Sequence, residues 1–250
     1  MRSFPLITAH TGCMGHSAHS LESLCAALKL GADVYEDDIR LTRDGVPVLA
    51  HDDEVLLSSG RHGSLAEMTL EELKHASVSP ILELAYVLTW IRTTGKTMNL
   101  DMKTDDALEP TYDLVRRMEM EDRVFLSGCG YERAALAQRM GSDIRKLLNV
   151  DIESFRTLSY EEAVQHACVE AKVAGCFGIN VPYQAVQPKM FKNAKRYNLD
   201  VYVWTVAESE DMKRLAQWGV NSITTRDPAA LIAVREEMNQ AEEIMEWRPS

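Results

Sequence analysis

The sequence predicts an α/β fold of the TIM (β/α)₈ barrel type, and three observations support this prediction. Short apolar runs alternate with amphipathic helical stretches, eight of each, along the chain. Eight strand–helix units in 250 residues give about 31 residues per unit, the spacing of such a barrel. The turn after the first strand, His10-Thr11-Gly12-Cys13-Met14-Gly15, lacks the glycine pattern of a doubly wound dinucleotide-binding sheet.

The predicted elements are short, and several helices carry recognisable ends. Ser20 and Ser209 are candidate N-caps of the first and seventh helices, and Gly31 and Gly219 follow the ends of the same helices. The strand candidates are Leu6–His10, Val34–Leu41, Met98–Lys103, Val124–Ser127, Arg145–Val150, Gly178–Val181, Val201–Val206 and Ser222–Thr225. The helix candidates are Leu21–Leu30, Ile81–Thr93, Leu108–Met120, Glu132–Met140, Tyr160–Val173, Pro188–Tyr197, Ser209–Trp218 and Pro228–Met245.

One irregular region interrupts the alternation after the second strand. Residues Val46–His51 predict an extension of that strand, and residues 52–80 predict an insertion with one short helix at Thr69–Ala76. No linker rich in Pro, Gly or Ser divides the chain. We therefore expect residues 1–250 to form a single barrel domain with this small insertion.

Composition excludes several classes of function. The 27 Lys and Arg against 38 Asp and Glu give a formal net charge of −11, without a basic run, which argues against a nucleic-acid-binding protein. No apolar run of about 18 residues predicts a membrane span. The five cysteines are odd in number and lack CxxC spacing, as expected for reduced thiols in the cytoplasm.

The C-terminal segment Ala230–Trp247 is rich in glutamate and predicts a solvated last helix. Trp247 is a candidate for a contact between subunits. The sequence does not fix the oligomeric state.

Polar residues gather at the carboxyl ends of the predicted strands, where a barrel has its active site. Because side chains alternate along a strand, Glu36 and Asp38 share one face and Asp37 lies on the other, while Asp101 and Lys103 share a face of the next barrel strand. Carboxylates inside a barrel are costly unless they are compensated, and a divalent cation with oxygen ligands would compensate them. The alternative is that these acids end a polar strand in solvent.

Two histidines, His10 and His51, also stand at predicted strand ends. Because imidazole titrates near neutral pH, one could act as general base and the other as general acid; the alternative is that each is a hydrogen-bonded structural residue. Lys103 could neutralise an anionic substrate or form an ion pair with a neighbouring carboxylate. The spacing of His16 and His19 assigns them no role, but both lie on the loop after the first strand, from which they could reach the site.

Several segments, in this order, resemble the glycerophosphodiester phosphodiesterase family. Ile7-Thr8-Ala9-His10-Thr11-Gly12 is similar to the family's A-H-R-G, and residues 31–52 follow G-A-D-x-x-E-x-D-v-x-x-T-x-D-G-x-P-V-x-x-H-D almost position for position. Asn99-Leu100-Asp101-Met102-Lys103 is similar to the E-x-K strand, with Asp in place of Glu. Val201–Val206 and Gly219–Thr225 are similar to the W-T-V and G-V-D-x-I-x-T segments. The resemblance covers the whole chain and is weakest between about residues 104 and 195.

The resemblance implies a TIM barrel that binds Mg²⁺ or Ca²⁺ through three carboxylates, Glu36, Asp38 and Asp101. It implies that His10 and His51 form the acid/base pair, that a hydroxyl next to the phosphodiester attacks phosphorus, and that water opens the resulting cyclic phosphate. Trp204 would form an apolar wall of the pocket; its alternative is core packing. The substrate-binding residues expected from the resemblance are Lys103, Thr11, Ser127 and Trp204.

Two positions depart from the family pattern. Thr11 stands where the family has Arg, and a hydroxyl cannot supply the charged, planar fork of a guanidinium. The P-E-N-T segment appears as Ser17-Ala18-His19-Ser20, so Ala18 replaces its acid. Three hypotheses therefore follow, in decreasing order of preference: a metal-dependent phosphodiester hydrolase, a metal enzyme acting on another substrate such as a glycoside, and a non-catalytic ligand-binding barrel.

Overall fold

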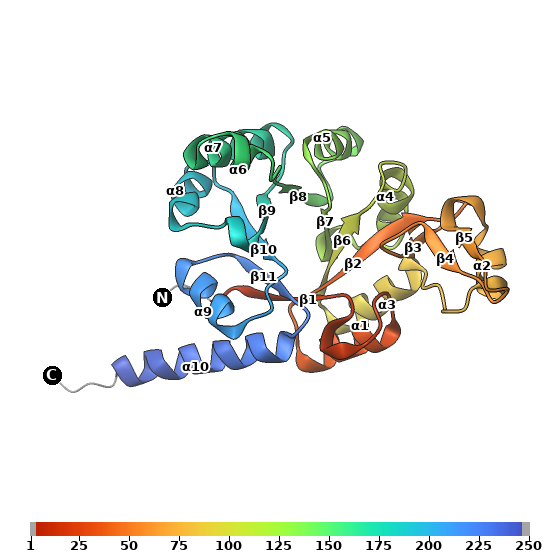
Figure 1. The fold of residues 1–250 in the computed structure, drawn as a ribbon, viewed down its shortest axis with the longest axis horizontal. Helices are drawn as coiled ribbons and strands as arrows, with labels where there is room; N and C mark the ends of the chain where they lie inside the picture. The colour runs from red at the N-terminus through yellow and green to blue at the C-terminus, as the bar shows by residue number, and fades with distance from the viewer. Residues whose placement is uncertain (1–3, 247–250) are drawn as a thin grey trace.

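The computed structural model describes residues 4–246, and within that range eight parallel strands close into a barrel with helices on its outside (Figure 1). The strands follow one another around the barrel in the order β1-β2-β6-β7-β8-β9-β10-β11, and the pairing of β11 with β1 closes it. The predicted TIM (β/α)₈ barrel is confirmed. Among the described helices, none is long and apolar enough to cross a lipid bilayer.

The eight predicted strands and the helices between them lie within a few residues of their expected bounds. The barrel strands are β1 Leu6–His10, β2 Val34–Leu41, β6 Thr97–Met102, β7 Val124–Ser127, β8 Arg145–Asn149, β9 Gly178–Pro182, β10 Asp200–Trp204 and β11 Ser222–Thr225. The main helices are α1 Leu21–Leu30, α3 Leu84–Thr94, α4 Leu108–Arg117, α5 Tyr131–Met140, α7 Tyr160–Val173, α8 Pro188–Arg196, α9 Ser209–Trp218 and α10 Pro228–Glu246.

The helix ends follow the predicted capping residues, with one exception. The Ser20 side chain accepts a hydrogen bond from the Ser23 N–H, and Gly31 and Gly219 end their helices in the left-handed conformation. Ser209 is not the N-cap of α9, because the helix begins at Ser209 itself and Glu208, which precedes it, makes no side-chain cap. That expectation was wrong by one residue.

The chain between β2 and α3 forms a small extension at one side of the barrel (Figure 1). Strand β3, Pro47–Leu49, pairs antiparallel with β2; β4, Glu54–Leu56, and β5, His62–Ser64, form a hairpin; and α2, Leu70–Ala76, begins with a capping box at Thr69. Helix α3 begins three residues later than expected because the carbonyl of Leu82 accepts a hydrogen bond from β3. The hairpin was not predicted, since strands of three residues carry too short an alternation.

The barrel interior has an apolar floor and a polar upper part. Val34, Phe125, Leu147 and Tyr202 form a buried cluster, and the Phe125 ring stacks edge-to-face on Tyr202 at 5.6 Å between centroids. Two residues further along the same four strands, on the same face, come Glu36, Ser127, Asn149 and Trp204. The alternation that builds the floor therefore also brings polar groups to the carboxyl end of the barrel.

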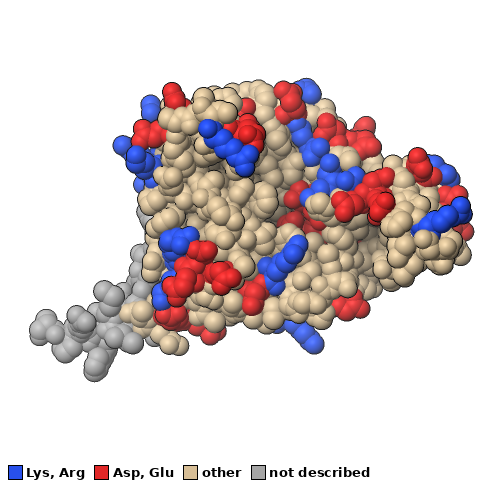
Figure 2. All heavy atoms as spheres, in the orientation of Figure 1, with Lys and Arg blue, Asp and Glu red and all other residues tan. Residues whose placement is uncertain are grey.

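The opposite faces of the strands pack against the helices in a separate, larger apolar core. Buried strand residues of this layer include Ile7, Ile39, Leu100, Leu126, Leu148, Ile179, Val203 and Ile223. On the surface, acidic and basic side chains are interspersed over the face seen in Figure 2. Helix α10 runs along the outside of the barrel and extends past it (Figure 1). Trp247, the expected contact between subunits, lies outside the described residues.

The packed floor predicts a large stability effect at its central ring. Phe125→Ala is expected to lower the free energy of unfolding by about 3–5 kcal/mol, because the aromatic neighbours cannot collapse into the cavity. Phe125→Leu, which keeps most of the volume, should cost substantially less. Urea unfolding followed by circular dichroism measures both, and equal stability of Phe125→Ala and wild type would contradict a packed floor.

Candidate functional site

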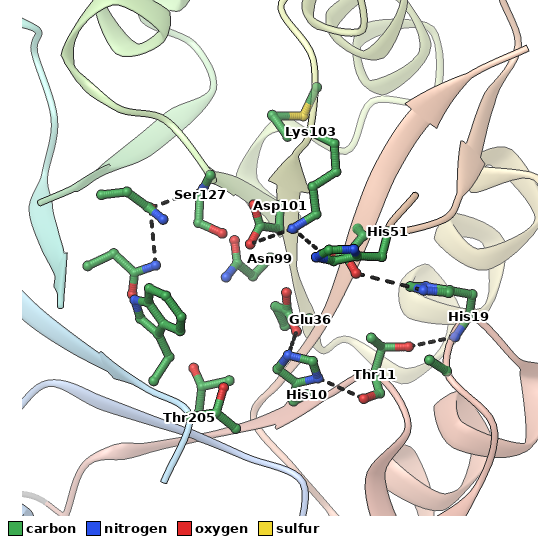
Figure 3. Close-up of a pocket in the computed structure, with 18 of the residues that line it drawn as sticks. His10, Thr11, His19, Glu36, His51, Asn99, Asp101, Lys103, Ser127 and Thr205 are labelled. Atoms are coloured by element: carbon green, nitrogen blue, oxygen red, sulfur yellow. Dashed lines mark hydrogen bonds and ion pairs between the residues drawn. The ribbon is translucent and has the colours of Figure 1, made fainter. Parts of the chain in front are cut away.

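The structure brings all nine sequence-predicted site residues to the wall of one cavity of about 560 Å³ at the carboxyl ends of the strands (Figure 3). Those nine residues are His10, Thr11, Glu36, Asp38, His51, Asp101, Lys103, Ser127 and Trp204. Sequence reasoning missed further polar lining residues, among them Asn149, Asn180, Arg133 and Arg226. The two asparagines occupy inward-facing positions of their strands, so the alternation of side chains could have identified them. The two arginines come after strands and follow no such alternation.

Three carboxylates from two adjacent strands meet at the centre of this cavity. In the register of β2 with β6, Asp38 lies beside Asp101 and Glu36 beside Asn99. Oxygens of Glu36, Asp38 and Asp101 all lie within 4.8 Å of one another. Glu36 Oε2 and Asp101 Oδ1 are buried and have no hydrogen-bond partner within residues 4–246. Such a set of unpartnered oxygens fits a hard divalent cation.

Burial controls the protonation of these acids. Loss of water contact, reinforced by the charges of Asp101 and Asp38, raises the pKa of Glu36 well above its ordinary value. Burial also raises the pKa of Asp101, although Lys103 opposes the shift. Three like charges in this space are therefore unfavourable without added positive charge.

Lys103 supplies part of that positive charge. Its Nζ lies 2.7 Å from Asp38 Oδ1 and 3.5 Å from Asp101 Oδ2. Burial alone would lower the pKa of Lys103, but the neighbouring carboxylates outweigh it and the pKa is raised. The ammonium group has three N–H donors, so one donor is left for another acceptor in the cavity.

His10 ends β1 beside Glu36 on β2, with 3.7 Å between His10 Nε2 and Glu36 Oε2. Its Nδ1 lies 2.7 Å from the carbonyl oxygen of Thr11. Because a carbonyl only accepts, Nδ1 is the donor, and in the neutral ring Nε2 is the free acceptor. Burial lowers the pKa of His10, and the positive charge of Arg226 lowers it further, while the hydrogen bond to the Thr11 carbonyl opposes the shift. Burial therefore disfavours the charged form of His10, whose Nε2 faces the cavity.

His51 occupies a different environment at the rim of the cavity. Its side chain is 63% exposed, against 19% for His10, and its Nδ1 lies 2.9 Å from Asp52 Oδ1. The two histidines therefore differ in burial, one enclosed and one in contact with solvent.

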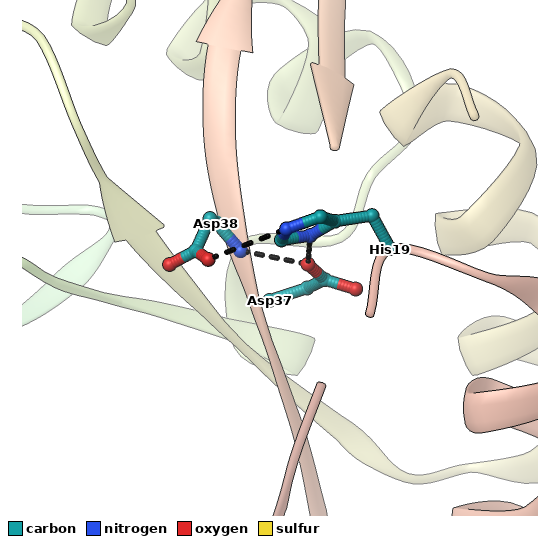
Figure 4. A group of neighbouring side chains, drawn as sticks. All are labelled: His19, Asp37 and Asp38. Carbon is teal, nitrogen blue, oxygen red and sulfur yellow. Dashed lines mark hydrogen bonds and ion pairs between the residues drawn. The ribbon is translucent and has the colours of Figure 1, made fainter. Parts of the chain in front are cut away.

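His19 is a third histidine of the cavity, one to which sequence reasoning assigned no role (Figure 4). Its Nδ1 lies 2.5 Å from Asp37 Oδ1, and its Nε2 lies 3.8 Å from Asp38 Oδ2. Burial would lower the pKa of His19, but the hydrogen bond and charge of Asp37 outweigh it and the pKa is raised. Ligand atoms of His19, Asp37 and Asp38 also lie close enough together to hold a metal ion.

Asp37 lies on the outward face of β2 and is fully buried. Besides the His19 ring, it accepts hydrogen bonds from the Tyr35 O–H at 2.8 Å and from the Asp38 N–H at 2.9 Å. A carboxylate predicted on the outer face of a barrel strand needs such partners, and that requirement is the signal that could have drawn attention to His19.

Thr11 is connected to the same group of residues. Its side chain is buried, and its hydroxyl oxygen accepts the His19 backbone N–H at 2.7 Å. His19 has a φ of +56°, which a residue with a side chain adopts only when its surroundings hold it there. The Thr11 hydroxyl therefore anchors the loop that carries His19, while Ala18 beside it offers the cavity no polar group.

The remaining predicted residues lie on the far wall. The Ser127 hydroxyl is buried and without a partner among the described residues. Asn149 Oδ1 accepts hydrogen bonds from the Gly128 N–H and from Asn180 Nδ2. Trp204 lies on the cavity wall with 38% of the residue exposed, and so outside the packed core.

Comparison with known proteins gives a consistent family. The profile of the Glycerophosphoryl diester phosphodiesterase family matches residues 10–230. The chain is similar to a glycerophosphodiester phosphodiesterase of Caldanaerobacter subterraneus subsp. tengcongensis, with 24% identity over 91% of this chain and 96% of the relative. It is also 24% identical to a glycerophosphodiester phosphodiesterase of Bacillus altitudinis, over 93% of this chain and 98% of that one.

Solved structures share the fold. A putative glycerophosphoryl diester phosphodiesterase from Silicibacter pomeroyi has a TM-score of 0.82 and 21% identity, with 95% of each chain covered. A phosphodiesterase from Oleispira antarctica, solved in complex with the product sn-glycerol-3-phosphate, has a TM-score of 0.77 and 20% identity, over 93% of this chain and 97% of that one. At these identities the likeness shows a common barrel.

The hydrogen bonds of Asp37 predict graded losses of stability. Tyr35→Phe removes one donor and is expected to cost about 1 kcal/mol. Asp37→Ala leaves the Tyr35 hydroxyl, the His19 ring and the Asp38 N–H without their acceptor, and is expected to cost about 3 kcal/mol or more. Urea unfolding of the two single variants and the double variant measures the coupling. Strictly additive effects would contradict a shared network.

Proposed function

The chain belongs to the glycerophosphoryl diester phosphodiesterase family, as its motifs predicted, and on that premise we propose that residues 1–250 form one hydrolase domain acting on a phosphodiester such as a glycerophosphodiester. The observation that carries the proposal is the meeting of three buried carboxylates with His10 in a single cavity, where His10 Nε2 lies 3.7 Å from Glu36 Oε2. That combination suits attack on phosphorus by a hydroxyl of the substrate next to the phosphodiester.

In this proposal Glu36, Asp38 and Asp101 would hold a divalent cation, Mg²⁺ or Ca²⁺. The unpartnered oxygens of Glu36 and Asp101 support the assignment, and an all-carboxylate set suits a hard cation. When bound, such an ion polarises the phosphoryl oxygens and lowers the pKa of a nearby hydroxyl. Lys103 offsets further charge and has a donor left for a non-bridging phosphoryl oxygen.

The two histidines would divide the proton transfers. One of the pair, His10 or His51, takes the proton of the attacking hydroxyl while the hydroxyl oxygen bonds to phosphorus, and the other donates a proton to the alcohol whose bond to phosphorus breaks. The product is a cyclic phosphate. Water then opens that ring with the roles reversed, so that both histidines return to their starting states.

Three other residues would shape the substrate pocket. Ser127 has a hydroxyl free to bind a substrate oxygen, and Trp204 offers an apolar wall. Because the Thr11 hydroxyl already accepts the His19 N–H, Thr11 would act on the substrate through the position of His19. The five free cysteines support a reducing compartment such as the cytoplasm for this activity.

Loss of the enclosed histidine tests the chemistry. His10→Ala is expected to lower kcat at least about 100-fold, because one of the two proton transfers loses its side chain. Phosphorus NMR with glycerophosphoglycerol and Mg²⁺ or Ca²⁺ measures turnover, and His75→Ala, on the exposed face of α2, serves as the matched control. Sugar release from a panel of glycosides without turnover of any phosphodiester would reject the proposed reaction.

Removal of one carboxylate tests the cation site with a measurement independent of turnover. Without metal, Asp101→Asn is expected to raise the midpoint of thermal unfolding, because it removes a buried like charge. At a metal concentration 100 times the Kd, the free energy of unfolding of the wild type should rise by about 2.7 kcal/mol. The variant should need a much higher metal concentration for the same rise. Asp113→Asn on α4 is the control. The same metal response in all three proteins would contradict the assigned ligands.

A further inference from the structure

One cation of the cavity has no partner. Among the described residues, the Lys and Arg side chains that line the cavity are Lys103, Arg133 and Arg226. Lys103 pairs with Asp38, and Arg133 binds Asp105 at 2.5 Å and donates to backbone carbonyls. Among residues 4–241, whose side chains the structure describes, the Arg226 guanidinium has neither an ion pair nor a hydrogen bond. Arg226 is therefore the cation available to an anionic ligand.

The backbone of Arg226 is fixed beside His10. In the register of β1 with β11, Ala9 pairs with Thr225; His10 is the next residue on β1, and Arg226 directly follows the end of β11. The carbonyl of Arg226 accepts the Met14 N–H at 2.9 Å. Because β1 lies between β11 and β2, Arg226 and the carboxylates of β2 stand on opposite sides of His10.

A second cleft of about 650 Å³ opens on the Arg226 side. It shares Thr205 and Arg226 with the main cavity, and its other lining residues are Met14, Gly15, Val206, Ala207, Thr225 and Asp227. Arg226 is the sole Lys or Arg among the described residues of this lining. Its one acid, Asp227, is already engaged, since its Oδ1 accepts the Ala230 N–H at the start of α10.

We propose that this cleft is the subsite for the second alcohol of the phosphodiester, and that Arg226 binds a carboxylate or phosphate group carried by that alcohol. The inference rests on the proposed phosphodiesterase function and adds its substrate class. Around the barrel, the carboxylates of β2 are followed by His10 at the end of β1, then by Arg226 after β11 and the second cleft beside it. Because the two cavities share Thr205 and Arg226, a phosphodiester bound in the main cavity in front of the carboxylates and His10 can extend one of its two ester groups past Arg226 into the second cleft.

The guanidinium suits this role because its planar fork of donors matches both oxygens of a carboxylate or phosphate. An alcohol with a fixed positive charge, such as choline, meets repulsion at the same point. The chain is therefore selective for phosphodiesters with an additional negative charge on the second alcohol.

The test compares three glycerol phosphodiesters whose second alcohol is glycerate, glycerol or choline, that is, anionic, neutral or cationic. In the wild type, kcat/KM is highest for the glycerate diester and lowest for the choline diester. Arg226→Met should raise KM for the glycerate diester about tenfold and leave the neutral diester within about twofold. Arg226→Lys should keep part of the preference, and Arg139→Met on the exposed face of α5 should change none of the three.

The outcomes that contradict the proposal differ in what they overturn. An equal rise in KM for all three diesters means that Arg226 binds the phosphodiester group itself and overturns the subsite. No change on Arg226→Met also overturns it, and both results leave the proposed hydrolysis intact. Absence of turnover of all three by the wild type, with Mg²⁺ or Ca²⁺ present, overturns the proposed function and with it the inference.

Discussion

Mutual repulsion among three enclosed carboxylates is the constraint on which the rest of this structure depends. Glu36, Asp38 and Asp101 approach one another within 4.8 Å. At such a separation, and at an effective dielectric constant of about 20, two unit charges repel by roughly 3–4 kcal/mol. The apolar floor keeps water from beneath them, and the hydrogen-bonded barrel prevents their strands from moving apart. The fold thus stabilises a site that by itself opposes folding, and the site in turn attracts positive charge, from Lys103 or from an ion.

The buried carboxylate on the outward face of β2, Asp37, is stabilised by hydrogen bonds rather than by a cation. Asp37 is as deeply buried as its neighbours, but three donors, from Tyr35, Asp38 and His19, satisfy it. The two departures from the family motif, at Thr11 and Ala18, lie on the loop that this hydrogen-bonded group holds in place. Thr11 and the Ala18–His19 segment no longer provide an arginine and an acid, and they are instead joined by the hydrogen bond that holds His19 over the cavity. The loop after β1 has replaced one polar arrangement with another.

Much of the fold and of the site was predictable because both follow from the period of a strand. The positions of Glu36, Asp38 and Asp101 on inward faces need only the alternation and the knowledge that barrel sites lie at strand ends. The β4–β5 hairpin was not predictable, because three-residue strands leave no periodic signal. The positions of His19 and Arg226 in the cavity do not follow from the strand period, because each lies in a loop whose direction depends on hydrogen bonds to other residues, such as Thr11 and Met14.

The two faces of β2 have a consequence for how this chain can vary. Along that strand Val34 packs in the floor, Glu36 and Asp38 line the cavity, and Asp37 lies against the outer layer. Insertion or deletion of one residue within the strand would exchange the two sets, turning the paired acids toward the helices and Asp37 inward. Relatives can therefore differ freely in the length of the loops on either side, whereas the number of residues from Val34 to Asp38 is as fixed as the identity of the acids themselves.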